Sequence, residues 1–365
     1  MKYSRACLLL SLASLLAACA SPPPRRTERS ADEVRSQLVT LIPASVAERA
    51  GWAADIQDAF ARIDVPPSTE NLCAALAVVE QESTYRADPE VPGLPRIARR
   101  EIDRRAAEMH VPQFLVRTAL DLESPEGRTY AQRIARVRTE RELSVIFEDL
   151  VAEVPLGGRL FASSNPVRTG GPMQVSIAFA QGYADKHGFP HGEGESVRHA
   201  VFTRRGGLYF GIAHLLDYEN SYDRHLHRFA DFNAGWYASR NAAFQSALAT
   251  ATGRKLALDG DLVLADRVGE TERAARSLAR ELGMDDKAIR RALERSDRFD
   301  FEESGLYLQV FALAERKAGS VLPRAVLPQI RLESPKITRP LTTAWFANRV
   351  QERYQRCVNR ALSGA

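Results

Sequence analysis

The chain has 365 residues, of which 45% are hydrophobic and 26% are charged, with 22 glycines and 19 prolines. These proportions are typical of a folded globular protein and argue against collagen-like, disordered or multi-spanning membrane proteins. The net charge of +4 comes from 50 basic and 46 acidic residues. Because the arginines are interleaved with acidic residues along the chain, the sequence does not predict nucleic-acid binding.

The N-terminus has the pattern of an export signal. Lys2 and Arg5 precede an apolar run over residues 6–20. The run is shorter than the roughly 20 residues that a membrane-spanning helix needs, and it suits the apolar region of a signal peptide. We therefore expect residues 1–18 to be a signal peptide.

The apolar run ends in the letters LAAC at residues 16–19, which resemble the lipobox of bacterial lipoproteins. The resemblance implies cleavage before Cys19 and a lipid on Cys19 that anchors the protein to a membrane. Ala20 stands where an inner-membrane retention signal would have aspartate, which favours the outer membrane, on its periplasmic face. An ordinary secretory signal with a chance cysteine is the alternative.

Residues 19–34 are expected to form a lipidated tether. Three consecutive prolines at 22–24 favour an extended backbone. The charged and polar residues 25–30 that follow offer no apolar face to bury.

Two cysteines remain in the exported chain, since Cys7 leaves with the signal peptide and Cys19 carries the lipid. In an oxidising compartment Cys73 and Cys357 can form a disulfide, which would tie the C-terminus to the start of the core. Two separately buried thiols are the alternative.

Helical periodicity dominates the remaining sequence, so the fold class is predicted to be mainly α. One segment breaks the pattern: Asp259-Gly260-Asp261 lies between the apolar runs 255–258 and 262–264. An Asp-Gly pair in this position predicts a small β-hairpin. Helices are expected near residues 44–63, 69–83, 97–119, 129–152, 176–186, 206–218, 226–247, 270–295, 303–318 and 343–361.

Glu82 is the candidate catalytic residue. On the expected helix Leu72, Leu76 and Val79 form one apolar stripe, and Glu82 lies at its margin near the helix C-terminus. Apolar surroundings and the negative end of a helix both raise the pKa of a carboxyl group. A glutamic acid that is protonated near neutral pH is what a general acid requires. A solvated residue at a helix end is the alternative.

Three further segments follow Glu82 and Ser83 along the chain. Residues 170–175 (GGPMQV) form a glycine-rich turn expected to lead into a helix, with Pro172 at the first helical position. Residues 232–235 read FNAG and residues 303–307 read ESGLY. In this order the set resembles the lysozyme-like domain of soluble lytic transglycosylases. That family carries a catalytic Glu-Ser, a Gly-Leu-Met-Gln turn, a Tyr-Asn-Ala-Gly segment, and a glutamate four residues before a tyrosine.

The resemblance implies a lysozyme-like domain over residues 35–320, followed by an extension over residues 321–365 that packs on the core. The family usually has a few tens of residues between its glutamate and its glutamine turn, whereas here the charged helical stretch at about 95–155 lies between them. We expect this stretch to be an insertion. Phe232 replaces the family's tyrosine and lacks its hydroxyl.

The resemblance also implies roles for single residues. Glu82 would be the general acid and base that cleaves the bond between N-acetylmuramic acid and N-acetylglucosamine in peptidoglycan, leaving a 1,6-anhydro end, with no cofactor. The other residues of the site would bind substrate, line the cleft or orient the acid: Ser83, Met173, Gln174, Asn233 and Tyr307. The alternatives are a helix-end hydroxyl for Ser83, a side chain that fills a gap in the core for Met173, and a ring in the core for Tyr307. For Gln174 and Asn233 the alternative is a structural amide.

Other motifs do not indicate a different site. His187, His191 and His199 surround a glycine-rich stretch, but the sequence has no His-Glu-x-x-His pattern or cysteine pair there, so no metal is expected. A muramidase that uses water is a variant of the same function. A non-catalytic lipoprotein that binds glycan or acts in an envelope complex is the alternative from another class.

Overall fold

The structure is a computed structural model that describes residues 29–153, 165–188, 196–332 and 339–364. The expected signal peptide and Cys19 lie outside these ranges. The described chain is mainly helical, which confirms the predicted class, with two short antiparallel hairpins. Within the described ranges, no helix combines the length and apolarity needed to cross a membrane.

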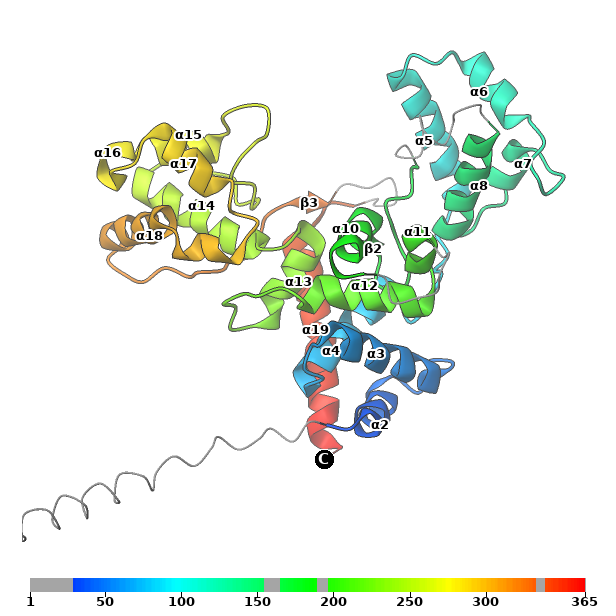
Figure 1. The fold of residues 1–365 in the computed structure, drawn as a ribbon, viewed down its shortest axis with the longest axis horizontal. Helices are drawn as coiled ribbons and strands as arrows, with labels where there is room; N and C mark the ends of the chain where they lie inside the picture. The colour runs from blue at the N-terminus through cyan, green and yellow to red at the C-terminus, as the bar shows by residue number, and fades with distance from the viewer. Residues whose placement is uncertain (1–28, 154–164, 189–195, 333–338, 365) are drawn as a thin grey trace, which may run out of the picture.

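The first hydrophobic core is built around α4, whose residues 72–79 are all buried. Because this helix is apolar on every side, it needs packing partners all round. α12 and α19 contact it directly, α19 also packs on α13, and α3 packs on α2 and α12 (Figure 1). The helices of this central part are α2 (Ala31–Leu41), α3 (Arg49–Ile63), α4 (Thr69–Glu82), α12 (Arg204–Leu216), α13 (His225–Ala234) and α19 (Thr343–Ser363).

The stretch expected to be an insertion forms a helical lobe that projects from the central part, cyan to green in Figure 1. The two long helices predicted here are each divided in two, at Pro112 and at residues 135–139. Proline lacks the N–H that an interior helical position donates, so a helix cannot run through it without a break. The lobe comprises α5 (Leu94–Glu108), α6 (Gln113–Leu120), α7 (Tyr130–Ile134) and α8 (Glu140–Ala152).

Two hairpins lie in the central part. β1 (Thr169–Gly170) pairs with β2 (Val175–Ser176), and the chain continues into α10 (Ile177–His187) and α11 (Val197–Val201). β3 (Arg331–Leu332) pairs with β4 (Leu341–Thr342) immediately before α19.

A second hydrophobic core lies apart from the first (Figure 1, left). α14 and α18 pack closely together and the shorter helices cover them. The predicted 35–320 domain therefore contains two cores, and the single helices expected over 226–247 and 270–295 are each broken. The elements here are α14 (Ala238–Thr252), α15 (Glu270–Arg276), α16 (Ala279–Leu282), α17 (Asp286–Leu293), η2 (Phe299–Glu303) and α18 (Gly305–Ala318).

The hairpin predicted around Asp259-Gly260-Asp261 is wrong, because residues 253–269 contain no strand. The backbone groups of this loop bond to side chains of α14 instead of to each other. The Gly260 N–H donates to Gln245 Oε1 at 2.9 Å, Gln245 Nε2 donates to the Asp261 carbonyl at 3.1 Å, and Asn241 Nδ2 donates to the Gly260 carbonyl at 3.2 Å.

α2 begins inside the segment predicted to be tether. Ser30 caps the helix by accepting the Glu33 N–H, and the Glu33 side chain accepts the Ser30 N–H in return. Val34 and Leu38 are buried on its inner face. Residues 31–34 of the predicted tether therefore belong to α2.

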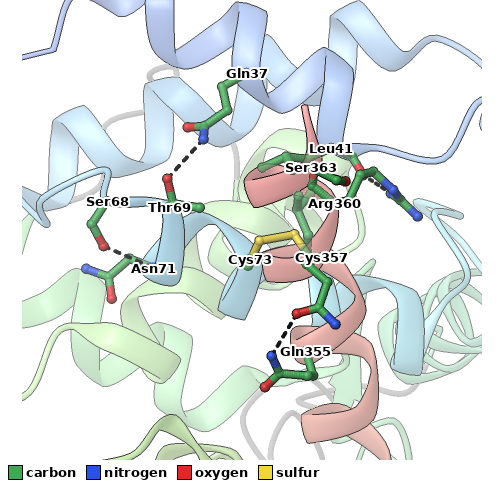
Figure 2. The surroundings of a disulfide bond; sticks show 12 residues. Gln37, Leu41, Ser68, Thr69, Asn71, Cys73, Gln355, Cys357, Arg360 and Ser363 are labelled. Atoms are coloured by element: carbon green, nitrogen blue, oxygen red, sulfur yellow. Dashed lines mark hydrogen bonds between the residues drawn. A yellow bond between two sulfur atoms is a disulfide. The ribbon is translucent and has the colours of Figure 1, made fainter. Parts of the chain in front are cut away.

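Cys73 and Cys357 form a disulfide that joins α4 to α19, with 5.5 Å between their Cα atoms (Figure 2). Neighbouring contacts bring α2 to the same place. Gln37 Nε2 donates to Thr69 Oγ1 at 2.9 Å, and the Arg360 guanidinium donates to the Leu41 carbonyl (Figure 2). The expected cross-link between the start of the core and the C-terminus is thus present.

Candidate functional site

Glu82 is the last residue of α4 and is partly exposed, directly after the fully buried stretch of that helix. Ser83 is 5% exposed and closes the helix end. Its N–H and its hydroxyl donate to the Val79 carbonyl at 3.1 and 3.0 Å, and its hydroxyl accepts the Arg86 N–H at 3.4 Å. The Ser83 hydroxyl is therefore engaged with the backbone, which favours a role in positioning Glu82 over direct contact with a sugar.

The turn after Glu82 contains two consecutive left-handed residues, Thr84 at φ 50° and Tyr85 at φ 58°. Tyr85 is buried, its ring meets the Trp52 ring edge-on at 5.5 Å, and its hydroxyl donates to the Leu76 carbonyl at 3.4 Å. Burial raises the pKa of the Tyr85 hydroxyl. A non-glycine residue in this conformation costs on the order of 1–3 kcal/mol, so the surrounding packing must hold the turn.

Gln174 lies in the turn between β1 and β2 and is also left-handed, at φ 50°. Its N–H and its Nε2 donate to the Gly171 carbonyl at 3.1 and 3.2 Å, while the Thr169 hydroxyl is 3.5 Å from Oε1. Gly171 has φ 73°, and a Cβ there would lie 2.0 Å from the Val201 carbonyl oxygen, so only glycine fits. Gln174 remains partly exposed.

The predicted role of Pro172 as the first residue of a helix is wrong. The turn is part of a hairpin, and α10 begins at Ile177 with Ser176 as its cap. Pro172 packs against Gly207 of α12, where a Cβ would lie 2.4 Å from its Cδ.

Met173 is fully buried and packs on α12 rather than lining a cleft. A Cβ on Gly211 would lie 2.5 Å from its sulfur. The close approach lets the methionine anchor the hairpin to α12, which favours the core alternative for this residue.

Asn233 is exposed near the C-terminus of α13, and its Oδ1 accepts the Thr343 hydroxyl at 3.1 Å. Its position depends on Asp231, which the sequence reasoning missed. The buried Asp231 carboxylate accepts the Tyr222 hydroxyl at 2.6 Å, the Ser239 N–H at 2.7 Å and the Tyr237 N–H at 3.0 Å. Burial raises the pKa of Asp231, and these hydrogen bonds oppose the shift.

Tyr307 does not lie beside Glu82, which corrects the orienting role that the resemblance implied. It is 3% exposed in the second core, with its ring 4.7 Å from Phe311 and 5.5 Å from Phe301. Figure 1 places α18 well away from α4. The residue belongs to the apolar face with which α18 packs on α14, so it is the core ring of the alternative reading.

The other segments do share one core. α12 contacts both α4 and β2, and α19 contacts both α4 and α13. These contacts gather the segments of Glu82, Gln174 and Asn233 around two helices. Among the described residues, non-glycine left-handed conformations occur at Glu48, Asp64, Thr84, Tyr85, His110, Gln174 and Tyr237. Four of these seven lie in, or within four residues of, the three segments.

A pocket of about 400 Å³ opens beside the end of α4. The sequence reasoning missed it, although one signal was available: Trp345, Arg349 and Arg353 are spaced by four residues and so share a face of α19. These three residues line the pocket together with Gln81 and Arg339.

The histidines do not gather into a metal site. Among the described residues, no group of three or more His, Cys, Asp or Glu side chains is placed to hold a metal ion. His199 Nε2 lies 2.8 Å from Glu148, and the His187 ring stacks on Tyr183 at 4.3 Å. His191 lies outside the described residues.

Comparison with known proteins gives relatives without an assigned activity. The uncharacterized protein YaiW of Escherichia coli (strain K12) is 56% identical over 350 residues, which cover 95% of this chain and 96% of the relative. No solved structure matches the chain. The sequence model of DUF1615, described as a protein of unknown function, matches residues 45–360. With most of its length matched, the chain belongs to the DUF1615 family.

Proposed function

We propose that the protein is a peptidoglycan lytic transglycosylase with a lysozyme-like central part, in which Glu82 is the general acid and base. One observation carries the proposal. The turns next to Glu82, at Gln174 and after Asn233 hold non-glycine residues in left-handed conformations, and the first two turns contribute buried residues to one core, which also includes Phe232 beside Asn233. Backbone strain of this kind persists where the surrounding structure enforces it, and it clusters at functional sites.

In the proposed reaction the Glu82 carboxyl group protonates the oxygen between N-acetylmuramic acid and N-acetylglucosamine, and the bond from that oxygen to the anomeric carbon breaks. The carboxylate then takes the proton of the muramoyl 6-hydroxyl while that oxygen attacks the anomeric carbon. Glu82 is protonated again at the end, a 1,6-anhydro ring forms, and no water is consumed. One carboxyl group suffices because the substrate supplies the nucleophile, whereas glycosidases ordinarily need two carboxyl groups.

The neighbouring residues divide into sugar contacts and supports. An amide NH₂ group has two N–H donors, and the Gln174 contact with Gly171 uses one of them. Asn233 engages Thr343 through its oxygen, so its NH₂ group can donate to a sugar. Ser83 and Met173 act as supports, since one closes α4 and the other anchors the hairpin.

The test compares two carboxylates of the same helix. Glu80 lies two residues before Glu82 and forms an ion pair with Arg356 at 2.8 Å, so Glu80→Gln is the matched control for Glu82→Gln. On purified peptidoglycan we expect wild type and Glu80→Gln to release 1,6-anhydro-muropeptides, measured by mass spectrometry. Glu82→Gln should reduce release by about 10²–10⁴-fold with an unchanged circular dichroism spectrum.

Each other outcome excludes a part of the proposal. Equal release by Glu82→Gln would overturn the assignment of the acid, and reducing instead of anhydro ends would indicate a muramidase. No release by any of the three proteins would favour the non-catalytic role in glycan binding or an envelope complex. That role draws support from the contact of Asn233 with Thr343, which places the start of α19 against one of the expected sugar-binding residues.

We further propose that Cys19 carries a lipid and that the protein is anchored to the periplasmic face of the outer membrane. α2 starts at Ala31, twelve positions after Cys19, so eleven residues lie between them. A chain of this length reaches at most about 40 Å at roughly 3.3–3.6 Å per residue, which keeps the enzyme close to the membrane. Metabolic labelling with palmitate should mark the wild type and not Cys19→Ser.

A further inference from the structure

The pocket beside α4 is built from three distant parts of the chain. Gln81 comes from the last turn of α4, Arg339 from the segment before β4, and the other lining residues from one face of α19. The Arg339 guanidinium lies 5.4 Å from the centre of the Trp345 ring. The disulfide between α4 and α19 holds two of these walls together.

The pocket is cationic. Three of its five lining residues are arginines, and no acidic residue lines it. Two carboxylates lie near its rim: Glu352, which contacts Arg349 at 2.6 Å, and Glu80, which is 3.6 Å from Arg353 and 2.8 Å from Arg356. Glu80 is thus shared between two arginines, so positive charge remains in excess.

Two polar atoms in the pocket wall are buried without a hydrogen-bond partner among the described residues: Arg353 Nε, which lies 3.6 Å from the Glu80 carboxylate in an ion pair too long for a hydrogen bond, and Gln81 Oε1. The first is a donor and the second an acceptor. A buried polar atom that is left unpaired costs on the order of 1–3 kcal/mol in stability, and such atoms are common where a ligand completes the bonding. The ligand would have to offer an anionic oxygen to the arginine and an N–H or O–H to the glutamine.

We propose that this pocket binds a carboxylate of the peptide that peptidoglycan carries on its muramic acid. Planar guanidinium groups match the two oxygens of a carboxylate or a phosphate. A peptide carboxylate has an amide N–H close by for Gln81. Trp345 offers a flat surface to the apolar part of the peptide.

The location fits this ligand, and the argument here rests on the proposed function. Gln81 immediately precedes Glu82, so their Cα atoms are about 3.8 Å apart. A muramoyl sugar that is held at Glu82 would carry its peptide next to the arginines. The volume of about 400 Å³ suits a short peptide segment rather than a glycan strand.

The experiment measures binding to the intact protein by calorimetry. The probes are N-acetylmuramoyl-L-alanyl-D-glutamate, its diamide, and inorganic phosphate. We expect the acid to bind at least about tenfold more tightly than the diamide. Arg349→Gln and Arg353→Gln should remove this preference. Arg356→Gln should keep it, because Arg356 lies on the same helix, contacts Glu80 and does not line the pocket.

Arg349 is the more informative variant because its side chain is 43% exposed, against 17% for Arg353, so its replacement disturbs the fold less. Equal binding of acid and diamide, or an unchanged preference in Arg349→Gln, would overturn the proposal. Full displacement of the acid by equimolar phosphate would also overturn it, in favour of a phosphate site.

The outcomes separate this inference from the proposed reaction. If wild type cleaves peptidoglycan and shows no preference for the acid, the pocket inference fails alone. If wild type binds the acid through Arg349 and releases no anhydro-muropeptides, the reaction fails and the pocket stands as a peptide-binding site.

Discussion

The parts of the molecule around the two hydrophobic cores differ in their buried charges and in their left-handed residues. In the second core, buried charges are paired: Glu272 is fully buried between Arg276 and Arg290, and Arg240 donates to the carbonyls of Ser296 and Arg298 at 2.6 and 2.8 Å. Over residues 238–318 every non-glycine residue avoids the left-handed region.

The central part differs in its backbone. It holds the left-handed residues after Glu82 and at Gln174. Buried polar atoms without a hydrogen-bond partner among the described residues occur in both parts, including Gln81 Oε1 in the first and Asp300 Oδ1 in the second. Backbone strain lowers stability and is retained where it serves a function, so we expect the proposed reaction in the central part and a structural role for the second core. Four measurements can break or sharpen this division.

The largest expected effect on stability is that of the disulfide. Replacing both Cys73 and Cys357 by alanine releases a link that spans 284 residues. In the chain-entropy account such a long loop contributes about 5–6 kcal/mol to the free energy of unfolding. Hydrogen exchange should accelerate in α4 and α19 while α14 and α18 stay protected. Equal acceleration in both parts would show that the two cores unfold as one unit.

The second measurement concerns the buried ion pair of the other core. Glu272→Gln removes the charge that faces Arg276 and Arg290, the latter at 2.9 Å. Removing one partner of a buried pair costs about 3–5 kcal/mol, and we expect the lower end of this range because Arg276 still pairs with Asp286 and Arg290 with Glu294.

Its matched control is Glu270→Gln, since Glu270 pairs with Arg273 at the surface and an exposed ion pair contributes little to the free energy of unfolding. Chemical denaturation gives both values. If Glu272→Gln changed the release of anhydro-muropeptides per folded molecule, the division between the two parts would be wrong.

The third measurement is the pH dependence of stability in the central part. His214 is covered by the rings of Phe179, Phe232 and Trp236, and burial lowers its pKa to about 4. The unfolded state therefore binds the proton more tightly than the folded state. The free energy of unfolding linked to neutral His214 is fully present above about pH 6.5 and is lost as the pH falls toward 4.

The loss amounts to about 2–3 kcal/mol at the acidic end of this range. Thermal denaturation from pH 7 to pH 4 should show it for wild type, and His214→Phe should make the curve shallower over this interval, with part of the slope left by His225 and His227, whose pKa burial also lowers. An unchanged slope in the variant would mean that another group carries the acid sensitivity.

Part of this architecture could be predicted from the sequence. The apolar stripe of α4 and the position of Glu82 at its end follow from helical periodicity, which is local. The cysteine pairing was one of two alternatives that the export signal and the cysteine count left open, and the structure has the disulfide. Each of these depends on few residues or on a simple exclusion.

Other features depended on contacts between distant segments. The loop at residues 253–269 has the sequence pattern of a hairpin. Its backbone groups instead form hydrogen bonds with side chains of α14, which the local sequence pattern cannot predict. The segment with Tyr307 matches a short motif, yet only the packing of α18 on α14 decides which core the ring enters. The pocket is lined by both Gln81 and Arg339. Helical periodicity cannot predict that two residues so far apart in the sequence line the same pocket.

The smallest expected effect is the most direct test of the idea that strain serves function. Thr84 is exposed and left-handed, so glycine should relieve its strain without loss of packing. Thr84→Gly should raise the free energy of unfolding by about 0.5–1 kcal/mol, since the relief of about 1–2 kcal/mol is offset in part by the entropy that glycine adds to the unfolded chain.

Asp64→Gly is the control, because Asp64 has φ 60° at the end of α3 and lies outside the three segments. Both variants should gain stability in urea denaturation, and only Thr84→Gly should release anhydro-muropeptides more slowly, because a freer turn no longer fixes Glu82. Equal activity of the two variants would mean that the turn after Glu82 is strained for reasons of packing alone.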